Sequence, residues 1–193
     1  LMSYGSGDED FVVFVSNNDG LLHSINVSDG SHNWAWIPEA LLGNVSALRA
    51  NEGMSFTDAP IYGLDGSWTP VKLADGTRLV VGGMRQGGTN VYALKLGSSK
   101  TAAPVLQWKK TPADTGFERL GYTWSQPVLT RLRYQGAVKE VFVFGAGLDK
   151  DLYEGGASAT SAGTDKGNGI YIVDAKTGAL LGSASNAALK YSI

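Results

Sequence analysis

The sequence predicts an all-β protein, a modified and partial β-propeller of about three four-stranded blades with a short helical insertion. One observation behind this is a layout that occurs three times: a short apolar strand, a Gly-rich reversal and a second short apolar strand, which is typical of a β-hairpin. The three hairpins are expected at residues 11–26, 78–95 and 140–174. The other observation is composition, because 26 of the 193 residues are Gly and only 18% are charged, which favours a turn-rich β protein over a helical one.

A further strand is expected after each hairpin, at residues 31–36, 105–108 and 179–181. A Pro-containing strand is expected before the second and third hairpins, at 59–63 and 125–132. Because Pro cannot donate to a β-ladder, these two strands are interpreted as sheet edges. The repeated unit is then a four-stranded meander, and such units arranged radially form a propeller. A β-sandwich of similar strands is the alternative, and the repetition favours the propeller.

The chain is predicted to be a single domain over residues 1–193, with blade segments at about 11–37, 58–109 and 124–184 and insertions at 38–57 and 145–168. The insertions account for a repeat that is longer than the ~40–45 residues of a plain blade. The first is expected to form a short helix with Pro38 in its first turn. The second is rich in Gly, Ala, Ser and Thr and is expected to be the most mobile internal segment.

The strand count indicates an incomplete ring. Only residues 1–10 precede the first hairpin, so the first unit is expected to lack its edge strand, which leaves fewer than three complete blades. Propellers typically close with about 4–8 blades. The missing blades are therefore expected to come from the rest of a longer parent protein, from another chain or from self-association.

Composition also excludes several classes of function. The net charge is −2 and the charges are mixed along the chain, so a nucleic-acid-binding stripe is not predicted. The absence of Cys excludes disulfides, thiolate catalysis and Cys-based zinc sites. No apolar run approaches the ~18 residues of a membrane span, and the polar start of the chain does not resemble a signal peptide.

No catalytic or cofactor-binding residues are predicted. His23 and His32 are the only histidines, and neither has a partner at a ligand spacing such as H-x-x-x-H. His23 occupies the same place in its unit as Tyr92 and Tyr171, which favours a packing role.

Three acidic residues, Asp149, Asp151 and Glu154, are the only metal candidates. Calcium takes 6–8 oxygen ligands, usually with a Gly at a sharp turn. Three carboxylates interrupted by Lys150 fall short of that, so a solvated loop is the preferred interpretation.

Three residues of the first unit are predicted to lie in the core: Val13, Ile25 and Trp34. Ile25→Ala is then expected to lower the free energy of unfolding by about 2–5 kcal/mol, as a large-to-small substitution of a buried residue does. The run at 11–15 is apolar at every position, which predicts a strand covered on both faces. Tryptophans on the outer strands are expected to pack between blades rather than to stack on sugars. The five Trp are Trp34, Trp36, Trp68, Trp108 and Trp124.

Several of these segments also resemble a known family. Residues 15–26, V-S-N-N-D-G-L-L-H-S-I-N, are similar to the "V-G-A-N-D-G-M-L-H-A-F-D" stretch of the C-terminal domain of the PilC/PilY family of type IV pilus biogenesis proteins and tip adhesins. Residues 36–42, W-I-P-E-A-L-L, resemble its "Y-I-P-S-A-L-L", and residues 120–127, L-G-Y-T-W-S-Q-P, its "L-G-Y-T-Y-G-K-P". Similar matches at 80–94, 142–147 and 171–178 follow the family's order.

The resemblance implies a modified propeller on a secreted, surface-exposed, pilus-associated protein that is not an enzyme. It implies roles in pilus assembly, by opposing retraction, and in adhesion and twitching motility, with pilins or minor pilins and host or surface receptors as partners. It also implies calcium on an Asp-rich loop in a longer parent, downstream of this chain, and no cofactor in the chain itself. The alternatives are a fragment of a pyrroloquinoline quinone dehydrogenase propeller, whose repeats are similar, and an envelope scaffold propeller.

Overall fold

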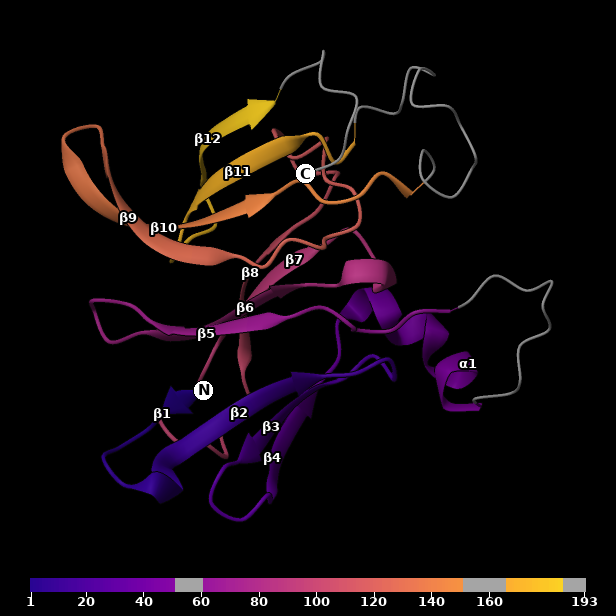
Figure 1. The fold of residues 1–193 in the computed structure, drawn as a ribbon, viewed down its shortest axis with the longest axis vertical. Coiled ribbons are helices and arrows are strands. Elements are labelled where there is room, and N and C mark those ends of the chain that lie inside the picture. Colours follow the sequence, from indigo (N-terminus) through magenta and orange to yellow (C-terminus); the bar gives the residue numbers. More distant parts are fainter. Residues whose placement is uncertain (51–60, 151–165, 186–193) are drawn as a thin grey trace.

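Three four-stranded antiparallel sheets make up the fold, and they lie side by side in a row (Figure 1). The structure is a computed structural model that describes residues 1–50, 61–150 and 166–185. Each sheet is a meander in which strands that follow one another in sequence are hydrogen-bonded neighbours. The predicted all-β, propeller-like class with four-stranded units is therefore confirmed.

The first sheet contains β1 (Met2–Ser3), β2 (Phe11–Ser16), β3 (Leu22–Asn26) and β4 (His32–Trp36). The second sheet contains β5 (Trp68–Lys72), β6 (Arg78–Gly83), β7 (Val91–Lys95) and β8 (Val105–Lys110). The third sheet contains β9 (Val128–Tyr134), β10 (Ala137–Gly145), β11 (Gly169–Asp174) and β12 (Leu180–Ser185). Short helical segments are η1 (Asp8–Asp10), η2 (Glu39–Asn44), α1 (Val45–Ala50) and η3 (Arg85–Gly87).

The first sheet does have an edge strand, so the expectation that it lacks one was wrong. β1 pairs with β2 through Met2 opposite Val12. Two residues are too short to produce a period-2 pattern, which is why the sequence did not reveal this strand.

The edge strand of the second sheet also lies elsewhere than predicted. It is β5, which contains Pro70 opposite Val80, and not residues 59–63. Residues 59 and 60 lie outside the described part of the chain, and 61–63 form no strand. The backbone N–H of Gly63 instead donates to the Asn18 side chain, 2.8 Å away, so this stretch belongs to the connection that crosses the first sheet's hairpin.

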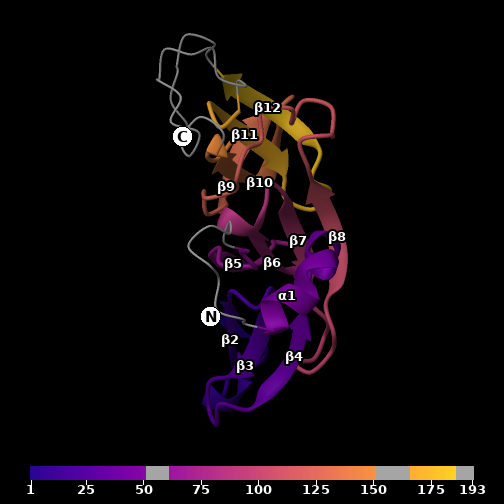
Figure 2. The same ribbon diagram turned by 90° about the vertical axis from the view of Figure 1, so that its right-hand side faces the viewer.

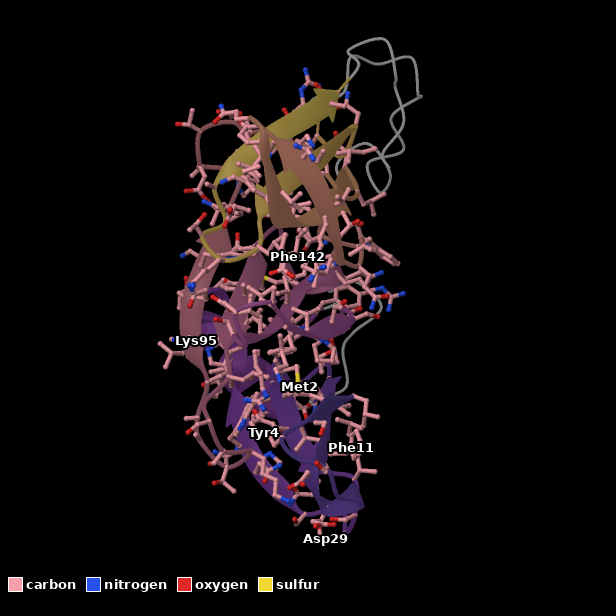
Figure 3. The ribbon with its side chains drawn as sticks, turned by 90° about the vertical axis from the view of Figure 1, so that its left-hand side faces the viewer. Met2, Tyr4, Phe11, Asp29, Lys95 and Phe142 are labelled. Atoms are coloured by element: carbon pink, nitrogen blue, oxygen red, sulfur yellow. The ribbon has the colours of Figure 1, made fainter. Side chains whose placement is uncertain are left out.

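The second sheet is buried on both faces, because β6 and β7 are apolar at successive positions. Val80 and Tyr92 belong to a core cluster shared with the first sheet, whereas Val81 and Ala93 belong to one shared with the third. Phe142 lies at the junction of the second and third sheets (Figure 3). Alternate residues of one strand thus fill two different cores.

The first sheet is covered on one face only. Trp34 is buried as predicted, but Val13 and Ile25 lie opposite each other on the face directed away from the second sheet and are only half-buried. Val15, on the same face, is 46% exposed. The prediction that both faces of this strand are covered was therefore wrong. Because Ile25 is only half-buried, Ile25→Ala is expected to lower the free energy of unfolding by less than the same substitution at a fully buried position.

The first insertion contains the predicted helix. Pro38 caps η2 from an extended conformation (φ −67°, ψ 141°), and α1 continues from its end. Leu41 is buried and anchors this segment. It packs against Gly20, where an added side chain would crowd it. The remainder of this insertion at 51–57, and residues 151–165 of the second, lie outside the described residues, so the predicted mobility of 145–168 stays a prediction. Among the described residues no helix is long and apolar enough to cross a membrane.

Candidate functional site on the hairpin face

One end of the three sheets gathers most of the irregular structure of the molecule. Among the described residues, the turns at 17–21, 84–90 and 146–150 meet the connections at 37–50, 61–67 and 111–127 there, on the right of Figure 1 and facing the viewer in Figure 2. We call this end the hairpin face. Because loops held by a rigid sheet scaffold are the usual location of binding residues, it is the first candidate for a functional surface.

The first junction on the hairpin face joins the first and second sheets. Asn18 accepts a hydrogen bond from Gly63, and the backbone N–H of Leu64 donates to the carbonyl of Asn17 at 3.1 Å. The Ser16 hydroxyl donates to the carbonyl of Gly66 at 2.5 Å. The turn residues of the first hairpin therefore also hold the neighbouring unit in place.

The second junction is organised by the buried side chain of Thr123. Its hydroxyl oxygen accepts a hydrogen bond from the N–H of Met84 at 2.8 Å and donates toward the carbonyl of Asn90 at 3.0 Å. Tyr122 and Leu148 exchange two backbone hydrogen bonds of 2.8 Å, which tie the same connection to the third sheet.

Replacing Thr123 with Val keeps the shape of the side chain and removes both hydrogen bonds. Because the Met84 N–H would be left buried without a partner, we expect a loss of about 1–3 kcal/mol in the free energy of unfolding, measured by denaturant titration. Thr123→Ser keeps the hydroxyl and should lose less. Little loss in Thr123→Val together with a larger loss in Thr123→Ser would show that the methyl group, and not the hydroxyl, matters at this position.

Backbones approach one another closely at these junctions, so there is no room for side chains. A Cβ on Gly87 would lie 1.6 Å from the carbonyl oxygen of Gly63. A Cβ on Gly121 would lie 2.2 Å from that of Leu148. The Gly residues of the turns therefore serve contacts between units as well as local reversals.

Two aromatic side chains lie on the outer side of the second junction, and each has a cation over its ring. The Arg85 guanidinium carbon is 4.2 Å from the ring centroid of Trp124, and the Lys150 ammonium is 5.1 Å from that of Tyr122. Arg85 has φ 52°, in the left-handed region that costs free energy for a non-Gly residue. Trp124 is 42% exposed and lies on the connection before β9, so the packing between units that is predicted for tryptophans of the outer strands does not extend to it.

A scan of the sequence against protein-family models finds no match. Two curated proteins do match: the type IV pilus biogenesis factor PilY1 of Pseudomonas aeruginosa, 30% identical over 151 residues, and a PilY1 homolog of Xylella fastidiosa, 32% identical over 127 residues. The matches cover 72% and 62% of this chain, but only 12% and 9% of those proteins. The solved C-terminal domain of Pseudomonas aeruginosa PilY1 superposes with a TM-score of 0.59 at 24% identity, over 90% of this chain and 29% of that one.

The chain belongs to the PilC/PilY family. It corresponds to a part of the C-terminal propeller-like domain of that family, and it spans a small fraction of the length of its curated relatives. A quinohemoprotein alcohol dehydrogenase of Pseudomonas putida HK5 superposes with a TM-score of only 0.33 at 12% identity, over 91% of this chain and 33% of that one, which is too low to support an argument.

For this PilC/PilY segment, the acidic metal candidates are described only in part. Asp149 follows β10 on the hairpin face and is 3% exposed, whereas Asp151 and Glu154 lie outside the described residues. Within residues 1–50, 61–150 and 166–185, no three His, Asp or Glu side chains converge as a metal-binding group would.

The structure brings together the two histidines, which no ligand spacing links in the sequence. His23 on β3 and His32 at the start of β4 lie on one face of the first sheet, with His23 Nδ1 and His32 Nε2 3.0 Å apart. A nine-residue spacing is not a recognised ligand motif. The strand register, which places Ile25 opposite His32, is the signal that would have revealed the pair.

Proposed function

We propose that this chain acts as a non-catalytic part of a type IV pilus biogenesis factor on the outer cell surface. The observation that carries the proposal is the similarity to PilY1, which extends over 72% of the chain and is accompanied by a superposition on the solved PilY1 C-terminal domain over 90% of this chain. In this role the domain supports pilus assembly by opposing retraction and contributes to adhesion and twitching motility.

The hairpin face supplies a surface suited to protein contacts. It carries the exposed Trp124 and its Arg85 partner on a backbone held by hydrogen bonds between units, so the side chains are presented from a rigid base. Trp and Arg are the residues that most often dominate binding energy at protein interfaces. We propose pilins or minor pilins, and host or surface receptors, as the partners, with the remaining propeller blades supplied by the rest of a longer parent or by another chain.

A chimera tests the pilus role. The matching segment of Pseudomonas aeruginosa PilY1 is replaced by this chain, and the chimera is expressed in a strain that lacks PilY1. We expect surface pili, measured in sheared fractions, and twitching zones to rise well above those of the deletion strain. Adhesion to a solid surface and accessibility to antibody on intact cells are measured in the same cultures.

A matched chimera that carries Trp108→Ala, which removes a core residue of the segment, is expected to lose this rescue. A wild-type chimera that is stable and exported, yet leaves piliation at the level of the deletion, would contradict the proposal. In a separate arm, the purified chain is incubated with pyrroloquinoline quinone, Ca²⁺ and an alcohol, and dye reduction is expected to stay at background. Sustained turnover would overturn the non-catalytic part of the proposal.

A further inference from the structure

We propose that His23 and His32 form a binding site for a divalent transition-metal ion, of the Cu²⁺, Ni²⁺ and Zn²⁺ class. The two imidazoles come from neighbouring strands of one sheet, so the scaffold between them is short and rigid. The inference does not depend on the proposed role in pilus assembly.

The strand register creates the pair. His23 is opposite Ala35 and His32 is opposite Ile25, with an irregularity between Ser24 and Ile25 that brings the two histidines to one face. That face is directed away from the second sheet, with His32 exposed and His23 half-buried. A metal ion can therefore reach both rings without any opening of the core.

The separation of the two nitrogen atoms suits chelation. His23 Nδ1 and His32 Nε2 are 3.0 Å apart, and the rings meet edge to face with centroids 5.2 Å apart. Two nitrogens bound at about 2.0–2.1 Å to one metal lie about 2.8 Å apart in square-planar geometry and about 3.3 Å apart in tetrahedral geometry. The observed separation lies between these values, so chelation requires the rings to turn toward a shared metal but not to move apart.

The donor set selects the class of metal. Imidazole suits Cu, Ni and Zn, whereas Ca²⁺ and Mg²⁺ require oxygen ligands. Two protein ligands leave the remaining coordination positions to water or to a ligand from a partner. Cu²⁺ is expected to bind more tightly than Ni²⁺ or Zn²⁺, following the general order of divalent affinities.

Asn17 contacts the other ring nitrogen of His23 and so influences which nitrogen of that ring carries the proton. Its Nδ2 is 3.3 Å from an Asp19 oxygen and 3.4 Å from His23 Nε2, while its Oδ1 accepts from the N–H of Leu21 at 3.3 Å. In this arrangement His23 Nε2 accepts a hydrogen bond from Asn17, so His23 Nδ1 carries the proton and donates a hydrogen bond to His32 Nε2. Metal binding at Nδ1 instead requires the proton on Nε2, where an acceptor at position 17 would stabilise it.

The test uses the 193-residue chain without a polyhistidine tag. Cu²⁺ and Zn²⁺ are titrated by calorimetry, with Ca²⁺ and Mg²⁺ as negative controls, and Cu²⁺ is also followed by electron paramagnetic resonance. We expect one equivalent of Cu²⁺ with splitting from imidazole nitrogens. His23→Ala and His32→Ala should each weaken binding by about tenfold or more, because loss of a residue that only orients a metal ligand already costs about 10–100-fold.

Two further variants make the test specific. Ala35→Ser alters the surface directly opposite His23 without removing a ligand and should bind as the wild type does. Asn17→Asp, made together with Asp19→Asn so that two carboxylates do not meet there, supplies an acceptor to His23 Nε2 and should tighten binding several-fold, even in about 1 M salt, where charge attraction is screened beyond about 3 Å. Circular dichroism and thermal unfolding confirm that each variant is folded.

Three results would overturn the proposal. The first is a wild-type chain that binds neither metal, and the second is a double variant of His23 and His32 that keeps the wild-type affinity. The third is an Asn17→Asp, Asp19→Asn double variant with unchanged or weaker affinity, which would reject His23 Nδ1 as the ligand atom.

Discussion

Replacing Trp108 with Ala is expected to lower the free energy of unfolding by about 3–5 kcal/mol, the usual cost of truncating a buried aromatic residue. Trp108 is 6% exposed and lies between the second and third sheets, with its ring edge-to-face against Phe142 at 6.2 Å. Its Nε1–H donates to the carbonyl of Ala175 at 3.0 Å in a buried position. The substitution therefore leaves both a cavity and an unpaired carbonyl group.

Trp124→Ala is the matched control, because it removes the same side chain from a position that is 42% exposed. Denaturant unfolding of the two variants should show a loss of less than about 1 kcal/mol for Trp124, since exposed cation–π contacts are worth about 0.5–1 kcal/mol. Similar losses for both variants would mean that the second and third sheets do not pack as described.

Gly87→Ala is expected to destabilise the protein by about 3 kcal/mol, at the upper end of what overpacking usually costs. The added methyl group would lie 1.6 Å from the carbonyl oxygen of Gly63, and neither backbone is free to move. The N–H of Gly87 is bound to Met84, and that of Gly63 is bound to Asn18. Relief of the clash requires a shift of the whole connection that joins the first and second sheets.

Gly43→Ala provides the comparison for Gly87, because a methyl group at Gly43 meets no atom within 4 Å. Its position in η2 means that Ala should be neutral or slightly stabilising, by less than about 1 kcal/mol. Thermal and denaturant unfolding of the two variants measure the difference. Equal stability of the two would show that Gly63 and Gly87 are not in close contact.

The hairpins were predictable because their strands are apolar at several positions and are separated by Gly-rich turns. Two of the edge strands were not, whereas β9 overlaps the strand expected at 125–132. β1 is only two residues long, and the Pro of β5 lies in its middle and not at its start. Gly63 shows the underlying difficulty. A Gly after an apolar stretch looks like the end of a strand, and only the neighbouring turn at Asn18 reveals that it lies in a crossing between units.

The candidate sites depended on contacts that sequence spacing does not encode. The run at 11–15 has no polar position to show which of its faces is covered, so the exposed Val15 and the buried Val12 looked alike. His23 and His32 needed the register of β3 and β4, including an irregularity beside Ile25. Tyr122 and Trp124 project outward because alternate residues of their connection, Gly121 and Thr123, are buried.

The row of sheets has a consequence for cooperativity. The two core clusters share no residue, and each fills the space between one pair of adjacent sheets. Among the described residues, the first and third sheets are therefore coupled only through the second, as in a one-dimensional chain with nearest-neighbour interactions. Val80 and Val81 are successive residues that pack at two different interfaces. A change in the stability of one outer sheet therefore reaches the other only through the second sheet. Either outer sheet can open while the rest stays folded, but opening the second sheet requires the loss of both interfaces at once.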